Sequence, residues 1–454
     1  MKKFRIFRLI LISIIILFPL LSLTKGDGLI SEIDNKYLTD YPDIKDGLFN
    51  FMHIFDNYLK DRLGGRERLL RLDGLIDDKL FKYLDHSLYE YGKEGHVFLK
   101  LERYDEDYEF LDSFSDYLLD IQNYCEERDT SFIYLLNPSK NTVYRRYLPD
   151  SYKYENKRLD YLRDALYEKG VNFVDNTDFL TKLSYQEQVM NLKYDAGHWN
   201  NLGAFYGVNN LLDRMKDYDS EIELNQLDDF EMIYTETENL MMSNIPIKDG
   251  IVNLVDKNNS FHFIDDELSE ELEIDENYSS FLLCESDVDN DVDLMLFSGS
   301  YFNTFGYTLL ARAVKNLELI HNYNNIINFD YYYNIFEPSF VVITSAEYAT
   351  TENYFNIDLM EKKTLNPKLI ESDYVKKSKE VKIIGIEEGK YLTKVRVELD
   401  DALFGYYKED GRVYDLIPEG DIWTFTFKNG DISFEGGEFY IDTHDSEKLI
   451  IDLK

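Results

Sequence analysis

The run from Phe132 to Leu136, followed by Asn137-Pro138, reads FIYLLNP. Five apolar residues in a row are too few for a typical helix and Asn-Pro stops a strand, so the run predicts a short buried strand. The segment before it predicts a helix, because its apolar residues have three-to-four spacing. These residues are Leu111, Phe114, Leu118, Ile121 and Cys125. A helix that leads into a buried strand is typical of an α/β chain.

The same alternation is repeated along the chain. A helix over about 157–168 ends at Gly170 and is followed by a strand from Val171 to Val174. Further along we expect a strand from Asp293 to Phe297, a helix from about Thr304 to Val314, and strands from Leu317 to His321 and from Phe340 to Thr344. An amphipathic helix is expected over 46–64. We therefore predict an α/β fold, a mostly parallel sheet with helices on both faces.

An acidic stretch over about 217–290 has little periodicity, and we interpret it as an insertion or connector. Around its end, alternate acidic residues resemble a calcium-binding loop, namely Asp287, Asp289, Asp291 and Asp293. Such a loop needs Gly at its sixth position, where this chain has Val292. A solvated loop is therefore the favoured interpretation.

After a Lys-rich linker over 361–379 the pattern changes to that of strands. Apolar residues alternate at Val395, Val397 and Leu399, and again at Trp423, Phe425 and Phe427. Asn429-Gly430 stands between Phe427 and Ile432 and predicts a tight hairpin. Residues 380–454 are thus expected to form a small all-β domain that follows a main domain over 29–360.

The amino terminus predicts export. Lys2, Lys3, Arg5 and Arg8 precede an uncharged apolar run over 9–23, the pattern of a signal peptide or a membrane anchor over residues 1–28. The run is short for a membrane span and Pro19 interrupts it, which favours a signal peptide, whereas the residues after it form a poor cleavage site, which favours an uncleaved anchor. In both cases the rest of the chain is expected outside the cell membrane, anchored at its outer face or secreted.

Composition and charge exclude several classes of protein. The 454 residues are 44% hydrophobic and 30% charged, which is typical of globular proteins. The 49 Lys and Arg against 87 Asp and Glu leave a formal charge of -38, so nucleic acid is not expected as a partner. The sequence has two cysteines, Cys125 and Cys284, and no Cys/His cluster, so neither a metal nor another cofactor is expected. The thiols are expected to be buried and free, with a disulfide as the alternative.

Two stretches carry residues suited to nucleophilic catalysis. In YDAGHWNN, residues 194–201, Asp195 precedes His198 by three residues, just ahead of a helix that starts near Asn200. The carboxylate can fold back on the imidazole, fix its tautomer and stabilise the imidazolium. In LFSGSYF, residues 296–302, a strand ends at Gly-Ser and a helix follows, which puts Ser300 at the positive end of a helix. The N–H of Ser300 or Tyr301 can there face an oxyanion.

Each of these signals has a simpler explanation when it is taken alone. A lone Asp-x-x-His is more often a helix cap with a hydrogen-bonded histidine, and Ser300 alone is most simply a turn or N-cap residue. Asp442-Thr443-His444 has a similar pattern at the end of a strand. No helix follows it, and we interpret it as unrelated to catalysis.

Taken together, the motifs resemble those of a known family. The motif DxxHWNxxGA is preceded by NPSK from Asn137, with Tyr144 and Leu148-Pro149, and is followed by FSGSY. The runs LTDYP from Leu38, FDNYLKDR from Phe55 and GHVFL from Gly95 add to the likeness. Over about residues 30–350 the sequence is similar to the extracytoplasmic SGNH-hydrolase-like proteins of the alginate O-acetyltransferase type.

The resemblance implies a role for each matching residue. Ser300 would be the nucleophile, His198 the base and Asp195 the residue that orients the base. Many members place the Asp two residues before the His and have Gly-Asp-Ser where this chain has Ser-Gly-Ser at 298–300. The residues assigned to the oxyanion site or to substrate binding are Tyr301, Trp199, Asn137, Lys140 and Glu347. For Lys140 and Glu347, exposure to solvent explains a charged residue almost as well.

Such a triad would form an acyl-enzyme that is passed to water or to a sugar hydroxyl, and no residue decides between these outcomes. The resemblance favours transfer, because such proteins commonly act beside a membrane-bound O-acyltransferase that exports the acyl group. We therefore predict an O-acyltransferase, specifically for acetyl, that acts on an extracellular or cell-wall polysaccharide. The alternatives are a carbohydrate esterase on the same fold and an inactive polysaccharide-binding protein whose Ser-Gly-Ser marks a lost site.

Overall fold

The computed structural model describes residues 30–31, 36–41, 48–62, 72–73, 75–81, 84, 86, 88–100, 107–150, 152, 155–240, 246–258, 260–264, 266–377, 381–434 and 436–452, together with 8, 12 and 13. The predicted signal peptide or anchor over 1–28 thus lies almost entirely outside the described residues. Within them, no helix combines the length and the apolar composition that crossing a membrane requires. The helix predicted over 46–64 is present as α2 (Leu48–Asp61).

A seven-stranded sheet forms the centre of the main domain, in the spatial order β6-β5-β13-β11-β12-β10-β9. The strands are β5 (Ser131–Asn137), β6 (Phe173–Asp175), β9 (Phe261–Phe263), β10 (Phe281–Ser286), β11 (Asp293–Ser298), β12 (Asn316–His321) and β13 (Phe340–Ala346). The first five in the spatial order are mutually parallel, whereas β10 and β9 continue the sheet in antiparallel fashion. The predicted α/β fold with a mostly parallel sheet is confirmed.

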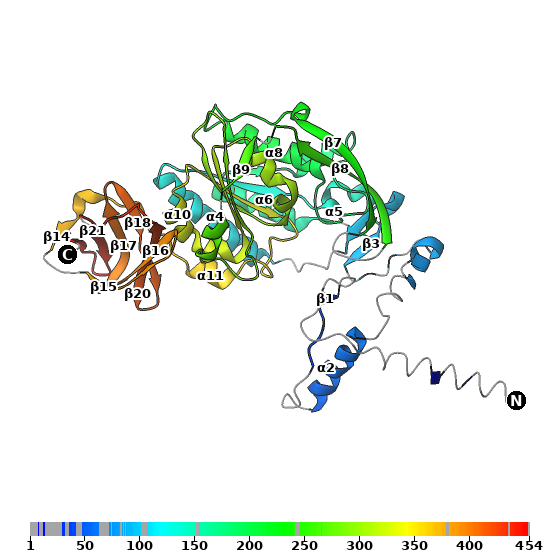
Figure 1. The fold of residues 1–454 in the computed structure, drawn as a ribbon, viewed down its shortest axis with the longest axis horizontal. Helices are drawn as coiled ribbons and strands as arrows, with labels where there is room; N and C mark the ends of the chain where they lie inside the picture. Colours follow the sequence, from blue (N-terminus) through cyan, green and yellow to red (C-terminus); the bar gives the residue numbers. More distant parts are fainter. Residues whose placement is uncertain are drawn as a thin grey trace.

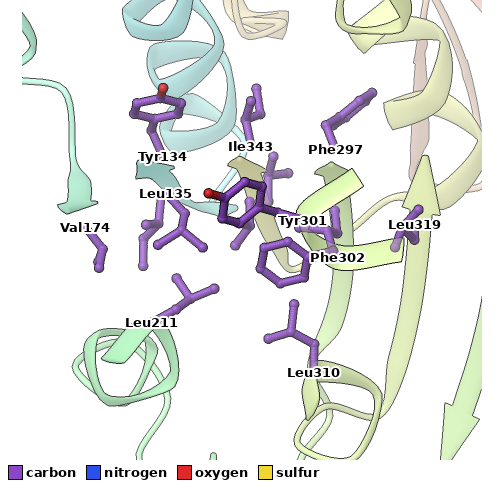
Figure 2. Close-up of a cluster of buried hydrophobic side chains, with 14 of the residues drawn as sticks. Tyr134, Leu135, Val174, Leu211, Phe297, Tyr301, Phe302, Leu310, Leu319 and Ile343 are labelled. Atoms are coloured by element: carbon purple, nitrogen blue, oxygen red, sulfur yellow. The ribbon is translucent and has the colours of Figure 1, made fainter. Parts of the chain in front are cut away.

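Helices cover both faces of this sheet, which explains why its inner strands are mostly apolar. α4 (Tyr108–Glu127) packs on one face beside α6 (Lys157–Lys169), and α8 (Asn201–Met215) and α9 (Tyr307–Ala311) pack on the other. Figure 2 shows Tyr134, Phe297 and Ile343 on one side of the sheet and Leu135, Leu211 and Leu310 on the other. All seven residues of β13 are buried.

The stretch over 217–290 is more regular than predicted. It contains a long antiparallel hairpin of β7 (Phe230–Asn239) and β8 (Pro246–Asp256), which extends along the main domain in Figure 1. It also supplies β9 and β10, so part of it belongs to the central sheet. β10 carries a short apolar run over 281–284, which was missed because the stretch around it is acidic and was interpreted as an insertion or connector.

The predictions for the aspartates and the cysteines can be compared with the structure directly. Asp287, Asp289 and Asp291 lie in the short connection from β10 to β11, and Asp293 begins β11. In the described part of the chain, no group of three or more His, Cys, Asp or Glu residues is arranged to hold a metal ion. Cys125 on α4 and Cys284 on β10 are both buried and free, as expected, so the alternative of a disulfide is wrong.

The carboxyl-terminal part is a two-sheet β structure, as predicted, and lies at one end of the molecule in Figure 1. One sheet has the order β14-β22-β21-β17-β18 and the other has the order β15-β16-β20-β19. The bounds are β14 (Val375–Lys376), β15 (Lys382–Glu388), β16 (Leu392–Glu398), β17 (Ala402–Glu409), β18 (Arg412–Asp415), β19 (Ile417–Glu419), β20 (Ile422–Lys428), β21 (Glu438–Thr443) and β22 (Lys448–Asp452). Aromatic residues of both sheets form a shared core, in which Tyr407 stacks on Phe425 with ring centroids 5.0 Å apart.

The predicted hairpin at Asn429-Gly430 is wrong. The turn itself is present, since Gly430 has φ 94° and the N–H of Asp431 donates to the carbonyl of Lys428. β20, however, pairs with β16 on one edge and with β19 on the other. The chain after the turn crosses to the other sheet, where it forms β21 between β17 and β22. The expected linker over 361–379 is also partly regular, since β14 pairs with β22.

Candidate active site

The carboxyl ends of the parallel strands meet at one edge of the central sheet. β12 lies on one side of β11, whereas β13 lies on the other side, between β11 and β5. The strands that follow β11 in the sequence are thus added first on one side of it and then on the other. In open parallel sheets, ligands bind outside the carboxyl ends of the strands at such a change of side. The chain that follows β11 holds Ser300, and the chain that follows β13 holds Glu347 and Tyr348. The predicted site residues are found around this edge.

Ser300 lies where a buried strand ends and a helix begins. β11 ends at Ser298, and the chain is helical from Ser300 through the π-helical turn η7 (Phe302–Gly306) into α9. The helix therefore begins and ends earlier than the predicted range from Thr304 to Val314. Ser300 is exposed to solvent. The N–H groups of Ser300 and Tyr301 belong to the first turn, where N–H groups have no partner within the helix.

Asp195 and His198 lie in a loop that the Asp195 carboxylate holds. Its Oδ1 accepts the backbone N–H of Gly197 at 2.9 Å and that of His198 at 3.1 Å. The His198 ring faces the same carboxylate, with Nδ1 3.0 Å from Oδ1 and 2.9 Å from Oδ2. Asn200 then caps α8, since its Oδ1 accepts the N–H of Gly203 at 2.8 Å. The local spacing Asp-x-x-His thus lets one carboxylate fix both the loop and the ring.

His198 also contacts Ser300, which is 102 residues further along the chain. The distance from His198 Nε2 to Ser300 Oγ is 2.7 Å. With Nδ1–H donated to Asp195, Nε2 is left to accept the hydroxyl proton of Ser300. The structure thus brings the three residues predicted as nucleophile, base and orienting acid into one hydrogen-bonded relay.

The electrostatics of Asp195 favour its charged form. Burial alone would raise the pKa of this carboxyl. The charge of His198, the bond to its ring and the two backbone N–H donors outweigh burial and lower the pKa below its ordinary value. Asp195 is therefore an anion throughout the neutral range and can stabilise an imidazolium at His198.

Trp199 and Tyr301 are buried behind the relay. Trp199 Nε1 donates to the carbonyl of Tyr301 at 2.9 Å. The Tyr301 hydroxyl lies 2.6 Å from the carbonyl of Pro138 and 2.9 Å from that of Gly197, and it can donate to either. The Tyr301 ring packs edge-on against His198, with centroids 5.2 Å apart. Both side chains therefore position the relay, and the group of Tyr301 that lies beside Ser300 is its backbone N–H.

Asn137 is fully buried at the end of β5, and neighbouring strands occupy its amide. Its Nδ2 donates to Thr344 Oγ1 at 2.7 Å, and its Oδ1 accepts from Asn176 Nδ2 at 3.0 Å. Asn322, which follows β12, donates from Nδ2 to the carbonyl of the same Thr344 at 2.6 Å. These amides tie the strand ends together, so Asn137 supports the frame of the site.

Lys140 is fully buried, so the alternative of solvent exposure is wrong for this residue. Its ammonium group donates to three backbone carbonyls, those of Val97 (2.7 Å), Asn191 (2.6 Å) and Leu192 (2.9 Å). Burial lowers the pKa of Lys140 to about 7, while the charges of Asp195 and Asp249 act in the opposite direction. Lys140 thus holds the segment that leads into the Asp195 loop.

Asp249, on β8 of the hairpin, holds the same segment through its N–H groups. Its Oδ2 accepts the N–H of Lys193 at 2.7 Å and that of Tyr194 at 2.8 Å. The buried Lys140 therefore binds the carbonyls just before the loop, and the buried carboxyl group of Asp249 binds the next two N–H groups. Sequence reasoning missed Asp249 because it lies in the stretch that was interpreted as an insertion or connector.

Glu347 is also buried, so exposure to solvent does not explain it either. Its Oε1 accepts from Ser139 Oγ at 2.6 Å, Thr142 Oγ1 at 2.5 Å and Asn156 Nδ2 at 3.1 Å. Glu347 thereby joins the segment after β13 to the short helix α5 (Lys140–Val143). Like Lys140, it stabilises the frame of the site.

Tyr348 is a residue of the site that sequence reasoning missed. Its hydroxyl lies 3.2 Å from His198 Nε2, the nitrogen that also faces Ser300. Burial, followed by the charges of neighbouring groups that include Asp195, raises the pKa of Tyr348 well above its ordinary value, so the hydroxyl stays a donor. Its position directly after Glu347, at the end of a buried strand, was the one signal in the sequence.

Comparisons with known proteins were made for the chain and for its structure. No protein-family model matches the chain, and no curated protein matches it. PatB1 of Bacillus cereus is similar in structure, with 15% identity and a TM-score of 0.43, over 57% of this chain and 96% of that chain. The O-acetyltransferase domain of AlgJ of Pseudomonas putida matches with 12% identity and a TM-score of 0.42, over 60% and 97%. A DHHW family protein of Eubacterium siraeum matches with 13% identity and a TM-score of 0.44, over 63% and 98%.

The resemblance that the sequence suggested, to SGNH-like proteins of the alginate O-acetyltransferase type, is thus confirmed as a similarity of structure. Matches this distant carry no argument about activity, so the chemistry has to be inferred from the side chains of this chain. The arrangement offers a hydroxyl with a base at hydrogen-bond distance, an ionised carboxylate behind the base, and backbone N–H donors at the start of a helix. These are the groups that nucleophilic acyl transfer requires.

Proposed function

We propose that this protein is a serine O-acyltransferase, and more narrowly an O-acetyltransferase, that works through an acyl-enzyme on Ser300. The proposal rests on the relay in which His198 Nε2 lies 2.7 Å from the Oγ of an exposed Ser300 while Nδ1 lies 2.9 Å from Asp195 Oδ2. A serine hydroxyl is a weak nucleophile until a base removes its proton. His198 is placed to do so.

In the first half of the reaction Ser300 becomes acetylated. Its Oγ bonds to the carbonyl carbon of the donor while its proton moves to His198 Nε2. The bond from that carbon to the leaving oxygen then breaks, and His198 passes the proton to the leaving oxygen. Asp195 remains ionised and stabilises the imidazolium between the two proton transfers. General base catalysis of this kind contributes about 10²- to 10⁴-fold.

The developing oxyanion needs donors beside Ser300. The N–H groups of Ser300 and Tyr301 lie in the first turn of a helix, where the backbone dipoles favour negative charge. One such donor contributes about 3 kcal/mol to stabilising the transition state. The tight packing of Tyr301 against Trp199 and His198 holds these N–H groups in place.

In the second half the acetyl group passes to the hydroxyl of an extracellular or cell-wall polysaccharide. The acceptor hydroxyl gives its proton to His198 Nε2, its oxygen bonds to the carbonyl carbon, and Ser300 Oγ leaves and takes the proton back. The resemblance of the sequence to proteins of the alginate O-acetyltransferase type supports this choice of acceptor. The 37 Tyr and 30 Phe residues are compatible with contact to sugars.

The protein would act at the outer face of the cell membrane, anchored there or secreted. A membrane-bound O-acyltransferase would supply the acetyl group. The support for this location is the basic and then apolar pattern of the first 28 residues. The support for the partner is the sequence resemblance.

The test is to trap the acetyl-enzyme. The full-length protein is incubated with p-nitrophenyl acetate, stopped in acid and measured by intact mass, and the adduct is mapped by peptide analysis. We expect one acetyl adduct on Ser300, absent in Ser300→Ala and retained in the control Ser220→Ala, which removes an exposed serine outside the site. An adduct that persists in Ser300→Ala would contradict the proposal.

The same preparation separates transfer from hydrolysis. Cello-oligosaccharides are added to the acetyl-enzyme, and acetylated oligosaccharide and free acetate are both measured. Acetylated sugar that depends on Ser300 supports the transferase. Free acetate alone supports the esterase, and the absence of any adduct supports the polysaccharide-binding protein.

A further inference from the structure

A small polar pocket lies beside Ser300, between the ends of β11, β12 and β13. Gly299, Asn322 and Tyr323 line one side of it, and residues 344–346 line the other. The pocket has room for about one water-sized group. A whole sugar ring does not fit, so any occupant is a single small group of a larger molecule or a water.

Asn322 gives the pocket a buried acceptor. The residue is fully buried, and its backbone N–H donates to the carbonyl of Ser298 at 3.0 Å. Its Nδ2 donates to the carbonyl of Thr344 at 2.6 Å, and this contact fixes the orientation of the amide, because a flipped amide would bring two oxygens together. Among the described residues its Oδ1 has no hydrogen-bond partner. A buried acceptor is stabilised only if an occupant of the pocket donates to it.

The pocket is open because residue 299 is glycine. A Cβ at Gly299 would lie 3.0 Å from the Tyr323 hydroxyl and 3.4 Å from Asn322 Oδ1. The Tyr323 ring is held in place by stacking on Tyr354, with centroids 4.6 Å apart, and by an edge contact with Tyr278 at 4.8 Å. Even the smallest side chain at position 299 would therefore take up the space between the two oxygens.

We propose that this pocket is a subsite for one hydroxyl group of the acceptor, next to the hydroxyl that is acylated, with Asn322 Oδ1 as its hydrogen-bond acceptor. The inference rests on the acyl transfer proposed above and adds which acceptors are preferred. An acetyl methyl group in the pocket would leave Oδ1 without a partner, and an oxyanion would be repelled by it. A hydroxyl donates to Oδ1 and can also bond to the Tyr323 hydroxyl. The preferred acceptors are therefore compounds with two neighbouring hydroxyl groups.

The test compares two small alcohols as acceptors of the acetyl group. Ethane-1,2-diol carries the second hydroxyl, and 2-fluoroethanol replaces it with a fluorine of similar size that cannot donate. The full-length protein is charged with p-nitrophenyl acetate, and kcat/KM for transfer to each alcohol is measured. We expect the wild type to prefer the diol by about tenfold, the value of one hydrogen bond. Because the ratio is taken within one protein, changes in the overall rate cancel.

Two variants remove the subsite in different ways. Gly299→Ala fills the pocket and Asn322→Ala removes the acceptor, and both are expected to remove most of the preference for the diol. If Asn322→Ala fails to fold, Gly299→Ala still decides the outcome. Gly385→Ala, at a glycine with open space around it, is the matched control and should keep the wild-type ratio.

The outcomes separate the two proposals. If the acetyl-enzyme forms and passes to both alcohols equally well, or if Gly299→Ala keeps the preference for the diol, acyl transfer stands and the subsite is wrong. If the acetyl group passes to water alone, the pocket holds water and the subsite is again wrong. If no adduct forms on Ser300, both proposals fail.

Discussion

Asp195 is the residue that joins the fold of the site to its chemistry. One carboxylate accepts two backbone N–H groups of its own loop and faces the ring of His198. The same bonds that fix the loop therefore fix the tautomer of the base. Since its pKa is lowered, this arrangement persists at any pH at which the protein is expected to act.

The substitution Asp195→Asn tests that link. The introduced amide oxygen can still accept the loop N–H groups, but the amide nitrogen favours the wrong tautomer of His198. We expect acetylation of Ser300 to fall by about 10³- to 10⁴-fold with little change in stability. The p-nitrophenol released by the full-length protein measures the rate. Asp442→Asn, in the similar Asp442-Thr443-His444 pattern, should leave the rate unchanged, and an equal loss there would refute the assignment.

Tyr348 gives a second prediction for a single residue. Tyr348→Phe removes the hydroxyl that lies 3.2 Å from His198 Nε2. The loss of one hydrogen bond in the site should lower the acetylation rate by about tenfold, far less than Asp195→Asn. Tyr185→Phe, which changes an exposed tyrosine, is the control. An unchanged rate in Tyr348→Phe would show that its hydroxyl takes no part.

For single residues, the sequence predicted the hydrogen-bonded relay of Asp195, His198 and Ser300 but not the buried residues that hold it in place. Asp195 and His198 are close in sequence, and Ser300 ends an apolar run, so local patterns identified all three. The three acceptors of Lys140, in contrast, come from segments 43 to 52 residues away. Tyr348 and His198 are separated by 150 residues. No local pattern indicates such contacts, and charge alone suggested exposure for Lys140 and Glu347.

Strand β12 carries an ionisable group in the middle of the sheet. Glu318 is buried, and burial raises its pKa to about 8, with Asp293 adding to the rise and Lys428 opposing it. One carboxyl oxygen has no hydrogen-bond partner among the described residues. The carboxyl is therefore mostly protonated in the folded protein at neutral pH.

The raised pKa predicts how stability depends on pH. Between the ordinary pKa near 4.5 and about 8, the folded state binds more protons at Glu318 than the unfolded state, so the free energy of unfolding falls as pH rises. Glu318→Gln has no titrating group at this position. Its free energy of unfolding relative to that of the wild type should therefore increase by a few kcal/mol between pH 4.5 and 8, and the difference should stay constant above pH 8. Urea unfolding at several pH values measures the difference. A difference that does not vary with pH would contradict the raised pKa.

The elements that the sequence identified best are the strands that are buried on both faces of the sheet. β5, β11, β12 and β13 lie inside the sheet, and their apolar runs predicted them almost to the residue. β10 has a short apolar run over 281–284, but it was missed because the stretch around it is acidic. The tight hairpin at Asn429-Gly430 failed for another reason: the turn signal is local, but the strand after it pairs with β17 and β22 of the other sheet, which the turn residues do not specify.

At the scale of the whole molecule, an ion pair between a half-buried arginine and a buried aspartate joins the β domain to the main domain. Arg128 at the end of α4 donates to Asp415 at the end of β18, at 3.0 Å from Oδ2 and 3.2 Å from Oδ1. Tyr124 bonds to the same carboxylate. Asn334 exchanges two hydrogen bonds with the backbone of Asp415, at 2.8 and 2.9 Å. The two domains are therefore expected to unfold together.

Asp415→Asn should uncouple them, because it removes the counter-charge of the half-buried Arg128, a change that costs about 2 kcal/mol. The chain has two tryptophans, Trp199 in the main domain and Trp423 in the β domain, so the substitutions Trp199→Phe and Trp423→Phe isolate each fluorescence signal. In the wild type the two urea transitions should coincide. In Asp415→Asn they should separate, whereas the exposed Asp421→Asn is the control. Coincident transitions in both variants would show that the ion pair is not the coupling element.

The position of β13 has a consequence for the making of the protein. It is the last strand of the central sheet to be synthesised, yet it lies between β5 and β11. Until residues 340–346 have emerged from the ribosome, the strand that pairs with both β5 and β11 is missing from the sheet. We therefore expect the relay of His198 and Ser300 to form only when the main domain is complete.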